Sequence, residues 1–71
     1  MAIKLEKCVN KNLYRIFKHN GILTIQKNCK YNCETIVELK SDLVPVDLAT
    51  MDDNEFLTLV GKLILETNQK Q

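Results

Sequence analysis

Three cysteines and one histidine are the side chains of this sequence with the most versatile chemistry. Cys8, His19, Cys29 and Cys33 supply four ligands of the type that zinc prefers. Their spacing is unlike that of structural zinc sites, which use closely spaced pairs of ligands, because only Cys29 and Cys33 are near each other in the chain. We therefore expect no metal and no cofactor, and a small zinc-stabilised domain is the second alternative.

These side chains do not form a catalytic pattern either. A cysteine nucleophile needs a base within hydrogen-bond distance and a third group that orients the base. The single histidine lies instead at a predicted loop, and a glycine-rich phosphate loop is excluded because Gly21 and Gly61 are the only glycines. We expect no catalytic residues and no enzymatic activity. The odd number of cysteines favours reduced thiols in the cytosol over a disulfide framework.

Charge is divided unevenly between the two halves of the chain. Residues 1–33 carry seven cationic residues and one anionic residue, a net charge of +6, whereas residues 34–71 carry three and eight, a net charge of −5. Cations beside aromatic side chains can bind a single-stranded nucleic acid or another anionic ligand. The candidate residues for this alternative function are Lys4, Arg15, Phe17, Lys18, Lys27 and Lys30. The acidic half can instead engage a basic protein partner or the basic half of a second copy.

Length and composition are those of one small globular domain. The chain has 71 residues, of which 45% are hydrophobic and 27% charged, and this balance argues against disorder. No segment reaches the roughly 18–20 consecutive apolar residues of a membrane span, and Lys4, Glu6 and Lys7 interrupt any secretory signal. We expect a cytoplasmic protein with no membrane partner. The abundance of Lys and Asn suggests an AT-rich genome, such as that of a low-GC bacterium or one of its phages, and the short length fits a phage or mobile-element origin.

The first 40 residues predict an antiparallel sheet. Asn20-Gly21 is the preferred dipeptide of a type I′ hairpin loop, and it would place Ile16 opposite Ile25. One sheet face would then carry Tyr14, Ile16, Leu23 and Ile25, and the other would carry Leu13, Arg15, Phe17, His19, Ile22, Thr24 and Gln26. Helical spacing of Leu13, Ile16 and Phe17 leaves a helix as the alternative for this segment. The expected strands are residues 2–9, 13–19, 22–28 and 34–40.

The last third of the chain predicts a helix over residues 52–67. Apolar side chains recur there at helical spacing, namely Phe56, Leu59, Val60, Leu63 and Ile64, and Asp52 can cap the first turn. Pro45 disfavours a central strand, so residues 43–48 are expected to be extended, as an edge strand or a covering loop. Residues 68–71 are expected to be a frayed tail.

The predicted fold is therefore α+β: a small antiparallel sheet of three to four strands, built from N-terminal hairpins and packed on one C-terminal amphipathic helix. One helix covers one face, so apolar side chains on the other face would stay exposed. Gly61 also lies on a second helix line with Leu57 and Leu65. We expect a small non-enzymatic inhibitor or adaptor that forms a homodimer and binds a protein partner through Leu13, Arg15, Phe17, Ile22, Leu57, Gly61 and Leu65.

Overall fold

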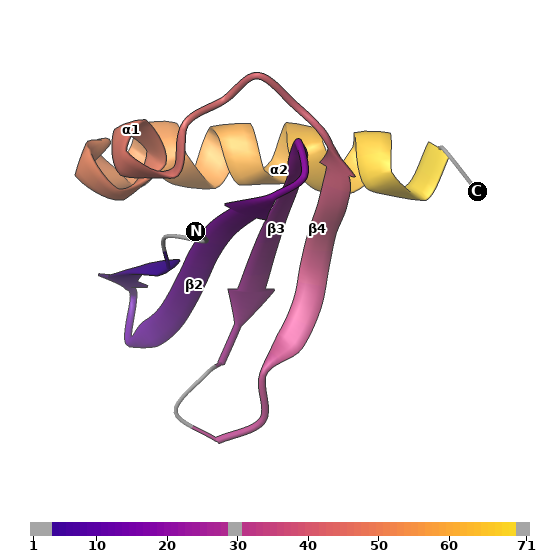
Figure 1. Cartoon of the computed structure of the whole chain (residues 1–71). Helices are drawn as coiled ribbons and strands as arrows, with labels where there is room; N and C mark the ends of the chain where they lie inside the picture. The colour runs from indigo at the N-terminus through magenta and orange to yellow at the C-terminus, as the bar shows by residue number, and fades with distance from the viewer. Residues whose placement is uncertain (1–3, 29–30, 70–71) are drawn as a thin grey trace.

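A computed structural model describes residues 4–28 and 31–69 and shows a four-stranded antiparallel sheet followed by two helices (Figure 1). The elements are β1 (Lys4–Val9), β2 (Asn12–His19), β3 (Ile22–Lys27), β4 (Glu34–Lys40), α1 (Pro45–Thr50) and α2 (Asp53–Gln69). The strands pair in the order in which they occur along the chain, β1-β2-β3-β4. The predicted α+β fold class is confirmed.

The hairpin between β2 and β3 has the predicted register. Asn20 and Gly21 both have positive φ angles, of 54° and 79°, as a type I′ loop requires. His19 pairs with Ile22, and Ile16 pairs with Ile25. The helical alternative for residues 13–19 is therefore wrong, and Asn12–His19 forms a strand.

The core lies between one face of the sheet and α2. Tyr14, Ile16, Leu23 and Ile25 are all buried, as expected for the better core face, and α2 buries Phe56, Val60 and Leu63 against them. The rings of Tyr14 and Phe56 meet edge to face, with centroids 5.2 Å apart. Asp52 caps α2, because its carboxylate accepts a hydrogen bond of 3.2 Å from the backbone N–H of Asn54.

The expected extended conformation of residues 43–48 is wrong from Pro45 onward. Val44 is extended, as the residue before a proline usually is, but Pro45 begins the six-residue helix α1. A proline fits the first helical position because its φ angle is already helical and because no intrahelical bond needs its missing N–H. Leu48 is fully buried and fixes α1 on the sheet.

The end of the predicted terminal helix also differs. Helix α2 continues to Gln69, so residues 68 and 69, expected to belong to a frayed tail, are helical; residues 70 and 71 lie outside the described residues.

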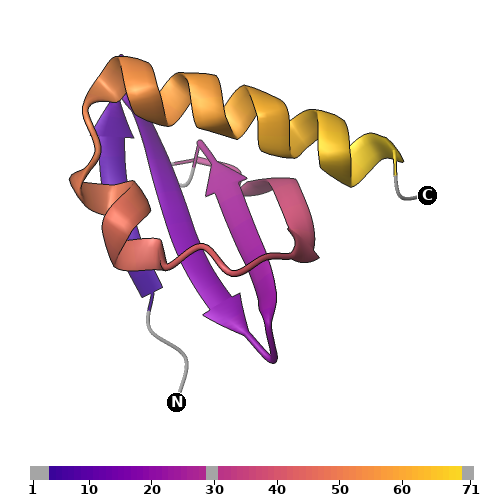
Figure 2. The same cartoon turned by 90° about the horizontal axis from the view of Figure 1, so that it is seen from above.

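Both helices cover the same face of the sheet (Figure 2). After β4 the chain returns across this face, and α1 contacts β1 and β2. Helix α2 then crosses the sheet and ends beside β4, where the backbone N–H of Glu38 donates a hydrogen bond of 3.2 Å to Oγ1 of Thr67. This contact covers part of the outer edge of β4.

Lys7 of β1 joins the sheet to both helices. Its ammonium group donates hydrogen bonds to the backbone oxygens of Met51, at 2.7 Å, and Ala49, at 3.4 Å, which lie at the C-terminal end of α1. It also lies 3.5 Å from a carboxylate oxygen of Asp53, at the start of α2, and 5.6 Å from the ring centre of Phe56. The side chain is only 12% exposed. Lys7 thus satisfies carbonyl groups that a helix end leaves without intrahelical partners.

We predict that Lys7→Met lowers the free energy of unfolding by about 2 kcal/mol, because the apolar stem remains while charge-assisted hydrogen bonds are lost. Urea denaturation followed by circular dichroism measures this change. Lys62→Met, on the exposed side of α2, is the matched control and should change stability by less than about 0.5 kcal/mol. Equal effects of the two substitutions would contradict the role assigned to Lys7.

Candidate functional site

The sheet face opposite the helices is not covered by any described element of the chain. We call it the open face. Alternation along the paired strands places on it Lys4, Glu6, Cys8, Leu13, Arg15, Phe17, His19, Ile22, Thr24, Gln26, Thr35, Glu38 and Lys40. Four of the predicted partner-binding residues, Leu13, Arg15, Phe17 and Ile22, are therefore brought together on one surface.

The middle of the open face is apolar and slightly hollow. Phe17 and Ile22 are half-buried and lie on either side of the pairing between β2 and β3, next to Thr24, which is only 8% exposed. Leu13 is also half-buried, but it lies four residues along β2 from Phe17, with Arg15 between them. A hollow of about 330 Å³ lies on this side of β2, β3 and β4; it is lined by Phe17, His19, Asn20, Ile22, Thr24 and Glu38. The open face thus offers a recess next to an aromatic side chain.

Charged side chains of both signs surround this apolar middle. The ammonium group of Lys4 lies 5.7 Å from the ring centre of Phe17. Arg15 forms an ion pair with Glu6, with 3.3 Å between Nη2 and Oε2, while its own Nε is buried without a hydrogen-bond partner. With Glu38 and Lys40 added, the face carries three cations and two anions, a net charge of +1. The electrostatic potential of the open face therefore has both positive and negative regions.

The residues proposed for nucleic-acid binding do not form one surface. Lys4, Arg15 and Phe17 share the open face, but Lys18 pairs with Leu23 and Lys27 pairs with Tyr14, which places both lysines on the side of the sheet that the helices cover. Lys30 lies outside the described residues. Only half of the proposed set is therefore placed together.

The possible zinc ligands are also separated. Cys8 pairs with Leu13 near one end of β2, and His19 ends the same strand, so about 20 Å separates them at the usual rise of a strand. Among residues 4–28 and 31–69, no three His, Cys, Asp or Glu side chains gather as metal ligands would. Cys8 is an exposed free thiol, Cys33 is disulfide-bonded, and Cys29 lies outside the described residues. The expectation of reduced thiols is therefore wrong for Cys33.

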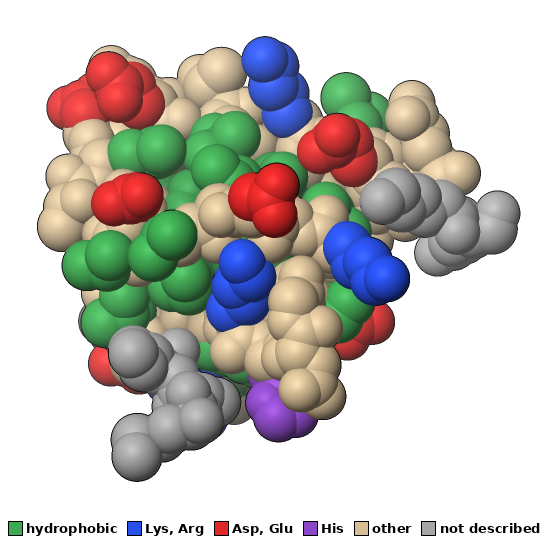
Figure 3. Space-filling model, turned by 45° about the horizontal axis from the view of Figure 1, so that its top comes forward, with side chains coloured by type: hydrophobic (Ala, Val, Ile, Leu, Met, Phe, Trp, Pro, Cys, Tyr) green, Lys and Arg blue, Asp and Glu red, His purple; other side chains and the backbone are tan. Residues whose placement is uncertain are grey.

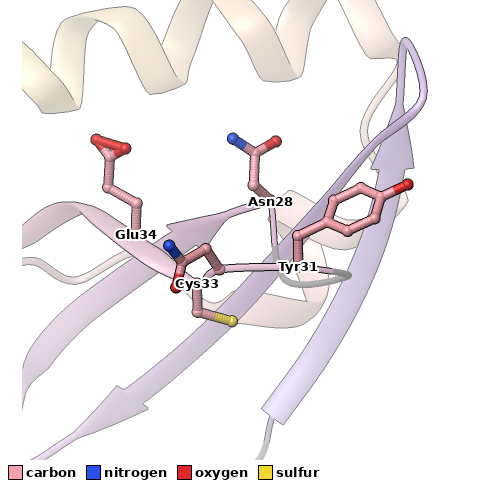
Figure 4. A pocket seen from close by; sticks show the side chains of 5 residues that line it. Asn28, Tyr31, Cys33 and Glu34 are labelled. Carbon is pink, nitrogen blue, oxygen red and sulfur yellow. The ribbon is translucent and has the colours of Figure 1, made fainter.

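A larger hollow, of about 600 Å³, lies at the connection between β3 and β4 (Figure 4). It is lined by Asn28, Tyr31, Asn32, Cys33 and Glu34, and Tyr31 is 92% exposed. Residues 29 and 30, which come between Asn28 and Tyr31 in the chain, are outside the described part of the structure. Its known lining is polar and exposed, so it is a weaker candidate than the open face.

The remaining predicted partner-binding residues lie on the opposite side of the molecule. Leu57 packs partly against the core, Leu65 is 61% exposed, and a Cβ atom at Gly61 would have no atom within 4 Å. Figure 3, with the helices turned toward the viewer, shows hydrophobic side chains between separate acidic and basic ones on this side. The seven predicted residues therefore divide into two surfaces.

The basic half of the sequence forms the sheet, and the acidic half forms mainly the two helices, so the two layers of the fold differ in net charge. Described residues up to Lys40, which form the sheet and its turns, contain seven cations and three anions, a net charge of +4. Residues 41–69, which include both helices, contain one cation and six anions, a net charge of −5. The helical layer is strongly acidic, whereas the cations of the sheet are shared between its two faces.

Sequence reasoning missed two features of the open face. Strict alternation along the predicted strand 34–40 would put Thr35, Val37 and Leu39 on one side, but a register shift opposite Ile25 and Gln26 pairs Thr35 with Gln26. The side chains of Thr35 and Gln26 consequently meet on the open face at 3.3 Å, whereas Val37 is buried. The shift also fixes Glu38 opposite Thr24, and no local pattern signals a bulge of this kind.

No protein-family model matches this chain, and neither a curated protein nor a solved structure is significantly similar to it. In the described part of the chain, neither helix is long and apolar enough to cross a membrane.

We predict that Gly61→Ala raises the free energy of unfolding by about 1 kcal/mol, because the added methyl group meets open space in an exposed helix interior. Thermal or urea denaturation measures the gain. Gly21→Ala is a useful contrast and should be destabilising, because Gly21 has a φ angle of 79°. A loss of stability for Gly61→Ala would show that another backbone packs closely against this position.

Proposed function

We propose that this protein is a non-enzymatic inhibitor or adaptor that binds another protein through the open face. The observation that supports this proposal most strongly is the unequal covering of the sheet. Helices α1 and α2 pack on one face, whereas on the other face Phe17 and Ile22 form an apolar patch that no described element covers, with Leu13 farther along β2. Apolar surface of this kind, bordered by charged side chains, is typical of protein-binding sites.

The residue types of the open face agree with a protein partner. Aromatic residues and arginine contribute much of the binding energy in many interfaces, and Phe17 and Arg15 lie two positions apart on the same side of β2. The recess beside Phe17 could accept an apolar side chain of the partner. Lys4, Glu6, Glu38 and Lys40 would then form a charged border that sets orientation more than affinity.

Single-stranded nucleic acid or another anionic ligand is the second candidate. The observation in its favour is the ammonium group of Lys4 beside the ring of Phe17, with Arg15 on the same face. Stacking on Phe17 and contacts of the two cations with phosphates are the expected interactions. The small net charge of the face and the position of Lys18 and Lys27 on the other side make this candidate the weaker one.

A photo-crosslinking experiment tests the leading proposal. We place p-benzoylphenylalanine at Phe17 in one variant and at Leu65 in a control variant, and irradiate cells of the source organism. We expect the variant at position 17 to form an adduct with a different protein, because a partner on the open face lies against this ring, and the variant at position 65 not to form it. Mass spectrometry identifies the adduct.

The outcomes of this experiment separate the candidates. An adduct that nuclease removes would favour nucleic acid, and salt-sensitive binding of an oligonucleotide that Arg15→Ala weakens would support the same conclusion. The absence of any adduct with another protein at position 17, or identical adducts at positions 17 and 65, would contradict the proposal.

A further inference from the structure

Four side chains of the open face form one row across the sheet. Lys4 pairs with Phe17, Phe17 pairs with Thr24, and Thr24 pairs with Glu38. The row therefore begins with a cation on the edge strand β1 and ends with an anion on the edge strand β4. Three strand spacings separate Lys4 from Glu38, about 14 Å, so the two charges cannot pair within one chain.

We propose that the open face binds a second copy of this chain, face to face, about a two-fold axis that runs parallel to the strands between β2 and β3. This rotation places β1 of each copy over β4 of the other and leaves the height of every residue along its strand unchanged. Lys4 of each copy then faces Glu38 of the second copy, and Phe17 faces Thr24 of the second copy. The row is thus complementary to itself.

Two stacked sheets can also be related by a two-fold axis that runs across the strands. The charges favour the axis along the strands over that arrangement. An axis across the strands, at the height of this row, would place Lys4 over Lys4 and Glu38 over Glu38 of the second copy, which is repulsive. The axis along the strands brings no like charges together in the neighbouring row either. In that row Arg15 faces Gln26 of the second copy and Glu6 faces Thr35.

The shape of the surface fits the same arrangement. Thr24 is short, and the hollow of about 330 Å³ beside it is lined by Phe17, Ile22 and Glu38 among others. The phenyl ring of Phe17 from the second copy falls opposite Thr24 and can enter this recess. Stacked sheets lie about 10 Å apart, a distance that interdigitating side chains of these sizes fill.

The expected dimer is weak. Four strands of about six residues cover roughly 400 Å² in projection on each copy. The roughly 800 Å² for the two copies together is below the ~1,200 Å² at which stable interfaces begin, as for weak, transient contacts. The two Lys4–Glu38 pairs lie at the border and contribute orientation, while the half-buried Leu13, Phe17 and Ile22 contribute most of the affinity. We therefore expect self-association in the micromolar range.

Charge reversal tests this dimer. Analytical ultracentrifugation of the wild-type chain should show a concentration-dependent dimer. K4E and E38K should each weaken association at least about tenfold, because each substitution places two pairs of like charges in contact. An equimolar mixture of K4E and E38K should regain dimers, because every reversed charge then faces an opposite charge on the other variant. The double variant K4E/E38K should regain them as well.

Two controls keep the result interpretable. K62E, a charge reversal on α2, and Leu65→Glu, on the exposed helix side, should leave association unchanged. Circular dichroism confirms that each variant is folded. A wild-type chain that stays monomeric up to about 1 mM, or a mixture of K4E and E38K that stays monomeric, would overturn the inference.

This inference rests on the proposed function in one respect: both use the open face as a protein-binding surface. The dimer and the binding of a different protein can nevertheless fail separately. If the mixture of K4E and E38K stays monomeric while Phe17 still crosslinks to a different protein, the inference is overturned and the proposed function is supported. If the mixture forms dimers and Phe17 crosslinks only to a second copy, the inference is supported and binding of a different partner is overturned.

Discussion

The structure depends on a simple constraint: a four-stranded sheet has two faces, and the helices of this chain cover one. Helix α2 has 17 residues, so it is about 26 Å long and can cross a sheet about 19 Å wide in one pass. It begins beside Lys7 on β1 and ends beside Glu38 on β4. Helix α1 fills the space over β1 and β2. All described helices therefore lie on the core side, and no described element covers the open face.

The two layers differ in charge as well as in secondary structure. The helical layer has a net charge of −5 over residues 41–69, with Lys62 as its one cation. Lys7 of the sheet contacts this layer at Asp53 and at the end of α1. Most of the other sheet cations lie at the border of the core side or on the open face. On the open face they alternate with Glu6 and Glu38, so this surface is suited to oriented contact with a protein of mixed charge more than to a uniformly anionic polymer.

Much of the fold could be predicted because its signals are local. The Asn20-Gly21 loop fixed the register of β2 and β3, and alternation along these strands identified both the core face and Leu13, Phe17 and Ile22 on the open face. Helical spacing identified the buried side of α2. A proline can interrupt a strand or begin a helix, and only the first was predicted at Pro45, whereas the structure shows the second, with Leu48 of the new helix buried.

The features that could not be predicted depend on contacts between distant segments. The bulge beside Gln26 and the position of Glu38 result from pairing between β3 and β4 across a connection that sequence periodicity does not describe. The contacts of Lys7 join residues more than 40 positions apart. The row from Lys4 to Glu38 requires all three strand registers at once, and only the register between β2 and β3 was available from the sequence.

The central claim is that copies of this chain associate through the open face and not through the exposed side of α2. Solvent paramagnetic relaxation of methyl groups, recorded with a soluble gadolinium chelate at increasing protein concentration, tests this claim most directly. The account predicts that the methyl groups of Leu13 and Ile22 become protected as the concentration rises, while those of Leu65 remain exposed. Protection of Leu65 with no change at Leu13 and Ile22 would contradict it.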